Sequence, residues 1–153
     1  MAQFLLITTL LSIGGLVATS IGGFMATPGH VANHIFLALI TVVLGLFSQS
    51  MTLFFFIGTG KQLKDKAKGT GHESEVGKAT RSLAMRVSPT ATYAMAALMV
   101  TFIMGGGVAS GKTPPWLHLS LSAATVLLYA RAYWVEIQAM QTNEQLMERF
   151  LKE

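Results

Sequence analysis

Two histidines stand at matching positions in two similar stretches of this chain. Residues 22–42 and 106–126 share six identical positions in one gapless register, and His34 of the first stretch matches His118 of the second. Imidazole is a common ligand of metal ions and of haem iron. Because histidine is rare in so apolar a chain, we expect His34 and His118 to face each other across a helical bundle and to hold a metal or a haem iron.

Small or hydroxylated residues follow each histidine at helical spacing, which leaves room between helices for a flat macrocycle. Thr41 lies seven positions after His34, and Thr125 lies seven positions after His118. Glycines near the same membrane level permit a close approach of the backbone to a ligand. Haem b with bis-histidine ligation by His34 and His118 is therefore the expected cofactor. The candidate cofactor-binding residues are His34, His118, His30, Gly23, Gly106, Thr41 and Thr125.

Two other interpretations of these stripes stay open. His30 lies four residues before His34 on the same helix face, so a three-histidine copper site with His118 is an alternative to haem. No Asp or Glu lies on that side, which disfavours zinc hydrolysis and carboxylate acid–base chemistry. Rows of small residues also serve plain helix packing in membranes, in which case no cofactor is bound.

The composition is typical of an integral membrane protein. The chain has 153 residues, of which 52% are hydrophobic and 12% are charged; its mean hydropathy is +0.53. Typical globular domains carry about twice that share of charge. The absence of cysteine excludes disulfides, thiolate metal sites and covalent haem attachment. The net charge of +4 comes from basic residues between apolar runs, so membrane topology explains it better than nucleic-acid binding.

Four apolar stretches are long enough to cross a bilayer, and they predict an all-α protein with four transmembrane helices in an up-down bundle. The expected spans are residues 3–26, 31–58, 90–108 and 116–138. Thr27-Pro28 and Thr113-Pro114 are typical helix starts, and Pro89 is expected to open the third span. The register of the histidines suggests two parallel hairpin repeats. The expected parts are a first transmembrane hairpin at 1–60, a basic cytoplasmic loop at 61–88, a second transmembrane hairpin at 89–138, and a cytoplasmic helical tail at 139–153.

The distribution of lysine and arginine predicts the orientation. Seven basic residues lie in the central segment, whereas the other two loops hold only Lys112. By the positive-inside rule the central segment and both termini lie in the cytoplasm, and the expected location is a prokaryotic inner membrane. One face of the tail, with Met147 and Phe150, is expected to dock a partner, a second copy or the central segment; a plain solvated helix end is the alternative. Glu136 lies five residues after Arg131 and is poorly placed to pair with it on the helix.

The leading interpretation is a small b-type cytochrome or haem-binding subunit that passes electrons between the outer face and a quinone or a membrane-protein partner. The architecture resembles the small b-haem membrane anchors of succinate dehydrogenase and the four-helix b-type cytochromes. The chain has no hydrolase or transferase motif, so it is at most an electron-transfer component. One alternative is a cofactor-free accessory subunit of a larger membrane complex, and a second is a small transporter. The expected partner is another membrane protein or further copies of this chain in a homo-oligomer. The near absence of ionisable residues at mid-membrane disfavours the transporter.

Overall fold

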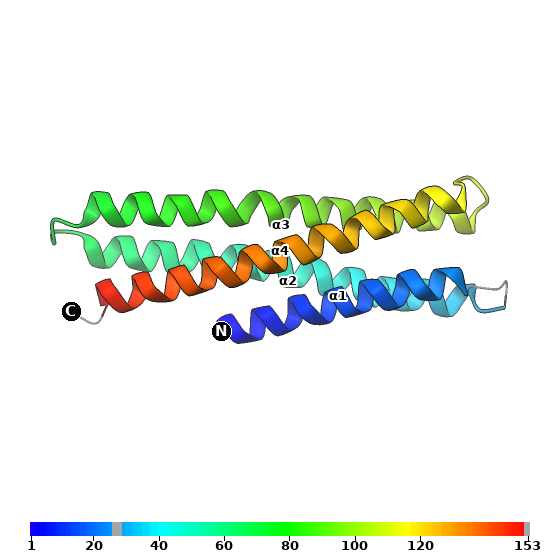
Figure 1. The fold of residues 1–153 in the computed structure, drawn as a ribbon, viewed down its shortest axis with the longest axis horizontal. Helices are drawn as coiled ribbons and strands as arrows, with labels where there is room; N and C mark the ends of the chain where they lie inside the picture. Colours follow the sequence, from blue (N-terminus) through cyan, green and yellow to red (C-terminus); the bar gives the residue numbers. More distant parts are fainter. Residues whose placement is uncertain (26–28, 152–153) are drawn as a thin grey trace.

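The computed structural model describes residues 1–25 and 29–151, and in these residues the chain forms four α-helices and no strand. They are α1 (Ala2–Phe24), α2 (Val31–Ala67), α3 (Glu73–Ala109) and α4 (Pro115–Leu151). Successive helices run back and forth along one long axis (Figure 1). Each helix contacts its chain neighbours, α1 also contacts α4, and α2 touches α4 across the bundle. The prediction of an all-helical chain is confirmed.

Within the described residues, α1, α2 and α3 are each long and apolar enough to cross a membrane. Many large apolar side chains point outward from the bundle, in addition to those that form its interior. Phe36 is 65% exposed and Leu127 is 71% exposed. A soluble protein rarely exposes so much contiguous apolar surface, whereas lipid tails would cover it at no cost.

Three of the helices extend well beyond the spans expected from hydropathy. α2, α3 and α4 have 37 residues each, which is about 55 Å at 1.5 Å per residue and longer than a hydrocarbon core of about 30 Å. The segment 61–88, expected to be a loop, is helical except for 68–72. Its lysines, alanines and leucines are good helix formers even though their charges lower the hydropathy. Gly69 and Gly71, with φ of 77° and 79°, form the turn.

The helix starts agree with the sequence patterns in part. α2 begins at Val31 and α4 at Pro115, close to the expected spans. Pro89 lies inside α3, sixteen residues after its start at Glu73, so the expectation that it opens a helix is wrong. Neighbouring helices can compensate the missing backbone N–H of a proline in a membrane helix. Thr27-Pro28, the other expected start, falls outside the described residues.

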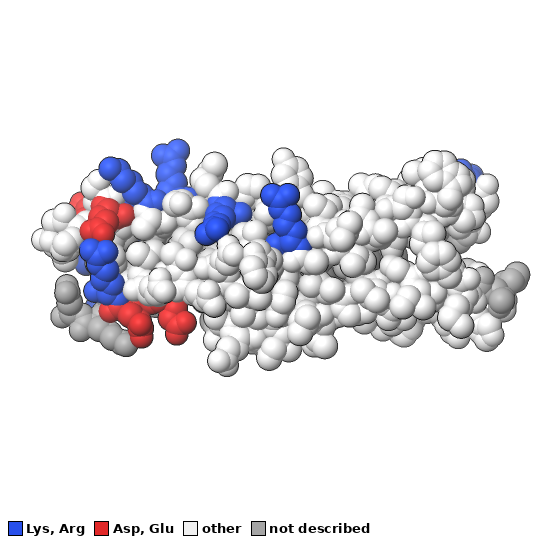
Figure 2. Space-filling model, viewed as in Figure 1, with Lys and Arg blue, Asp and Glu red and all other residues white. Residues whose placement is uncertain are grey.

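We call the region of the bundle around the 68–72 turn the charged end. Figure 2 shows Lys, Arg, Asp and Glu gathered on this half of the visible face, while the other half is almost free of charge. Here Met147 and Phe150 of α4 pack against the buried Leu63 and Val76 of α2 and α3. The apolar face of the tail therefore docks on the central segment, one of the three partners expected for it.

Ion pairs at the charged end are exposed. Lys68 Nζ donates to Asp65 Oδ1 at 2.7 Å, and Arg149 pairs with Glu75 at 2.9 Å. The hydrogen bond and charge of Lys68 lower the pKa of Asp65 below its usual value. Solvent screens pairs of this kind, so the apolar cluster stabilises this end more than they do.

Small polar side chains hold the helices together in the interior. The hydroxyl groups of Ser20 and Ser122 join α1 to α4 at 2.5 Å, and those of Thr101 and Thr125 join α3 to α4 at 2.7 Å. Hydroxyl groups of this kind satisfy one another where no water is present. These contacts bring the backbones close and fix the walls of the site described next.

Candidate functional site

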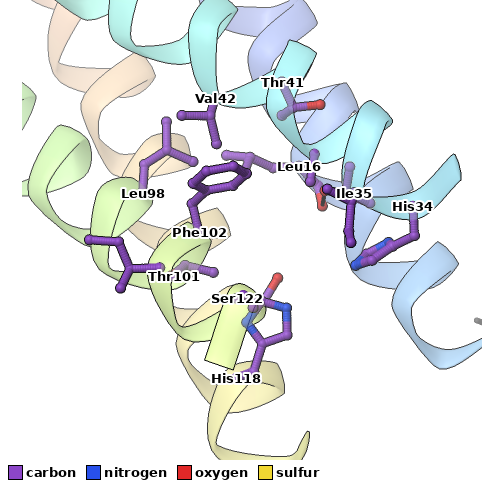
Figure 3. A pocket seen from close by; sticks show the side chains of 15 residues that line it. Leu16, His34, Ile35, Thr41, Val42, Leu98, Thr101, Phe102, His118 and Ser122 are labelled. Atoms are coloured by element: carbon purple, nitrogen blue, oxygen red, sulfur yellow. Dashed lines mark hydrogen bonds between the residues drawn. The ribbon is translucent and has the colours of Figure 1, made fainter. Parts of the chain in front are cut away.

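A cavity of about 230 Å³ lies among all four helices, toward the end of the bundle opposite the charged end. His34 of α2 and His118 of α4 project into it from two sides (Figure 3). A wider groove of about 620 Å³ adjoins the cavity and shares both histidines with it. The cavity walls between the histidines are mainly apolar: Leu16, Ile35, Ala38, Val42, Leu98, Phe102 and Ile103.

Each histidine ring rests on glycine of the helix that precedes its own helix in the chain. A methyl group on Gly23 of α1 would lie 3.4 Å from Cε1 of His34. A methyl group on Gly105 of α3 would lie 2.9 Å from Cε1 of His118, closer than a real side chain allows. Backbone therefore sets the orientation of both rings.

The two imidazoles have ring nitrogens without protein partners. Nδ1 of His34 and Nδ1 of His118 are both buried, and neither forms a hydrogen bond within the described residues. Buried polar atoms in proteins are nearly always paired, so two unpaired nitrogens in one cavity call for an explanation. A metal or haem iron, or a ligand with hydrogen-bond donors, would satisfy them.

The structure separates the other predicted site residues. His30 is exposed at the N-cap position of α2 and does not line the cavity. Among the described residues, no group of three or more His, Cys, Asp or Glu side chains is arranged to hold a metal ion, so the three-histidine alternative finds no support. Gly106 lines the cavity, with open space beside its backbone, and Gly23 lines the adjoining groove.

The two predicted threonines serve mainly in helix packing. Thr41 lines the cavity, but its hydroxyl donates to the carbonyl of Leu37 at 2.9 Å. The hydroxyl of Thr125 pairs with Thr101 and bonds to the carbonyl of Leu121, and Thr125 is not among the residues that line either cavity. Of the predicted cofactor-binding residues, the histidines and glycines therefore remain as candidates.

Glu136 is the functional candidate that the sequence reasoning missed. Its side chain is fully buried, with 0% exposed. Its carboxylate accepts hydrogen bonds from Gln49 Nε2 at 2.7 Å and from Thr9 Oγ1 at 3.0 Å. The signal was present in the sequence, because Glu136 continues the inner face of α4 seven residues after Tyr129.

Comparison with known proteins provides no assignment: no family model matches the chain, and no curated protein or solved structure is significantly similar to it.

Proposed function

We propose that this protein is a small membrane b-type cytochrome or haem-carrying subunit, with His34 and His118 as the axial ligands of haem b. The observation that carries the proposal is the facing pair itself. Two histidines from different helices line one apolar cavity, and each has a buried ring nitrogen with no partner among the described residues. Bis-histidine ligation needs this arrangement, with imidazoles on two sides of a water-poor groove.

The residues around the pair suit a redox cofactor. A bound haem would supply one-electron transfer. The apolar walls exclude water, and Gly23 and Gly105 leave the rings in place without crowding them. Neither cavity has an Asp or Glu in its lining, so no carboxylate competes as a ligand or as an acid–base group. The adjoining groove provides further volume within the range of about 300–1,000 Å³ that cofactor sites occupy.

We further infer that α4 crosses the membrane with the other three helices, so that the chain forms an up-down bundle of two similar hairpins. Each hairpin packs its histidine against a glycine of its first helix, Gly23 for His34 and Gly105 for His118, although the two glycines are offset by two positions in the 84-residue register. The basic residues gather at the charged end, which supports a cytoplasmic location for that end and for both termini in a prokaryotic inner membrane.

Absorbance spectroscopy tests the haem proposal. Protein purified in mild detergent from haem-supplied cells should show a Soret band that shifts on reduction. His34→Ala and His118→Ala should each weaken haem binding by more than about tenfold, because loss of an outer-shell partner alone typically costs about 10–100-fold in affinity. His72→Ala is the matched control, because His72 is exposed in the turn of the charged end. A wild-type protein that binds no haem on titration, or a Soret band that survives both cavity substitutions, would refute the proposal.

A cofactor-free accessory subunit is the second candidate, and a specific observation favours it. Thr41 contacts Gly15, and the hydroxyl pairs across α1, α3 and α4 use the small-residue stripes for helix packing. This role predicts a stoichiometric membrane-protein partner in a mild-detergent pull-down together with a wild-type spectrum that lacks haem. A haem-loaded protein without such a partner would exclude it.

A further inference from the structure

A second polar site lies between the histidine cavity and the charged end. We call it the polar cluster; its members are Thr9, Ser48, Gln49 and Glu136. All four side chains are buried, with exposed fractions of 0%. The hydroxyls of Thr9 and Ser48 lie 2.5 Å apart, and the carboxylate of Glu136 accepts from Thr9 and Gln49. Three helices therefore converge on one carboxylate inside the bundle.

Within the described part of the chain, no positive charge compensates this carboxylate. Among the described residues, no Lys, Arg or His forms an ion pair with Glu136. α1 has no charged side chain, and on α3 the exposed Arg86 donates to Gln138 instead. On the same inner face of α4 lies Tyr129, whose buried hydroxyl has no hydrogen-bond partner among the described residues. A buried anion without a cation is strongly unfavourable, and in membrane proteins such a residue is a functional-site hypothesis by default.

The partners of Glu136 suit both of its protonation states. Gln49 Nε2 now donates to the carboxylate, while Gln49 Oε1 is buried without a partner. Rotation of the amide by half a turn would bring Oε1 into position to accept the O–H of the protonated acid. The hydroxyl of Thr9 can likewise donate or accept. A lysine or arginine would hold the anion permanently, whereas glutamine and threonine stabilise either form.

The close contacts favour a proton over a metal ion as the ligand. The polar atoms of the cluster lie 2.5–3.0 Å apart in direct hydrogen bonds. Neither cavity described above reaches Glu136. An alkali cation would need oxygen ligands on several sides and would have to break these bonds, whereas a proton needs only one of them to reverse.

We propose that Glu136 is a proton-binding site in the interior of the bundle. On uptake an O–H bond forms on one carboxylate oxygen and the Gln49 amide turns to accept it; on release the proton returns to water and the present hydrogen bonds re-form. This site is independent of the haem proposal, since it involves neither His34 nor His118.

Infrared difference spectroscopy on the full chain in lipid vesicles tests the site. An ordinary Glu ionises with a pKa of about 4.3, so exposed carboxyls contribute little between about pH 6 and about pH 9. The wild type should show a protonated-carboxyl band that is lost as the pH rises. Glu136→Gln should lack the band, while Glu144→Gln should retain it, since Glu144 is exposed on the same helix.

Two further measurements make the result decisive. Thr9→Val retains the carboxyl but removes one of its donors, so it should shift the frequency of the band and leave its amplitude unchanged; it assigns the band even if Glu136→Gln does not fold. Exchange of potassium for sodium should leave the spectrum unchanged. The proposal is overturned if the wild type has no such band, if the band does not respond to pH, if Thr9→Val leaves it unshifted, or if sodium displaces the proton.

Discussion

Alanine at Gly105 should damage the histidine cavity, and alanine at the next residue should not. The two positions are adjacent in α3, so both substitutions gain about 1 kcal/mol of helix propensity. At Gly105 the new methyl carbon would lie 2.9 Å from Cε1 of His118, whereas at Gly106 it would meet no atom within 4 Å. Relieving the first contact requires the ring to move by about 0.5 Å, and overpacking of this kind costs about 1–3 kcal/mol.

Because both variants gain the same helix propensity, the difference between their free energies of unfolding reports only the contact with His118. Gly106→Ala should be as stable as the wild type or more stable by up to about 1 kcal/mol, and Gly105→Ala should be less stable than Gly106→Ala by about 1–3 kcal/mol. Thermal unfolding in detergent, followed by circular dichroism, gives the stabilities, and the Soret absorbance gives the haem content. If Gly105→Ala equals Gly106→Ala in both measurements, the ring of His118 does not rest on Gly105 and the described site geometry is wrong.

Two further substitutions probe the rest of the bundle. Gly45→Ala would place a methyl carbon 2.8 Å from the hydroxyl oxygen of Tyr129, whereas Gly58→Ala, the control in the same helix, meets no atom within 4 Å. Gly45→Ala should therefore be less stable than Gly58→Ala by about 1–3 kcal/mol, and equal melting temperatures of the two variants would contradict the expected clash. Leu63→Ala leaves a cavity at a fully buried position of the charged end, so it should lower the free energy of unfolding by about 2–5 kcal/mol. The Soret absorbance should not change, and a changed haem spectrum would show that the two ends of the bundle are coupled.

Hydropathy and turn signals indicate which segments suit a membrane, but they do not predict where the helices begin and end. The expected spans began near the true starts of α1, α2 and α4. For α3 the expected start at Thr90 was wrong, since the helix begins at Glu73. Hydropathy reports whether a segment suits lipid, whereas helix formation depends on backbone propensity and on packing such as that of Val76 on Leu63.

The candidate sites were predictable to different degrees. The register of His34 and His118 indicated one shared site, and both rings line one cavity; haem ligation itself stays a prediction. The sequence does not predict which of the three glycines at 105–107 contacts His118. The rotation of α3 about its axis relative to α4 decides this, and in the structure it places Gly105 beneath the ring. For Glu136 the sequence offers Arg131 as a charged neighbour on the same helix, whereas its actual partners come from α1 and α2, more than 80 residues away in the chain.

The seating of each histidine on its own hairpin bears on how the protein assembles. His34 of α2 rests on α1, and His118 of α4 rests on α3, so each hairpin can orient its own imidazole before the two hairpins meet. The cavity itself comes into existence only when the hairpins associate, because its lining is drawn from all four helices. A ligand bound by both rings would therefore link the two hairpins. Binding of that ligand would then be coupled to the association of the hairpins, and so to the last step of folding.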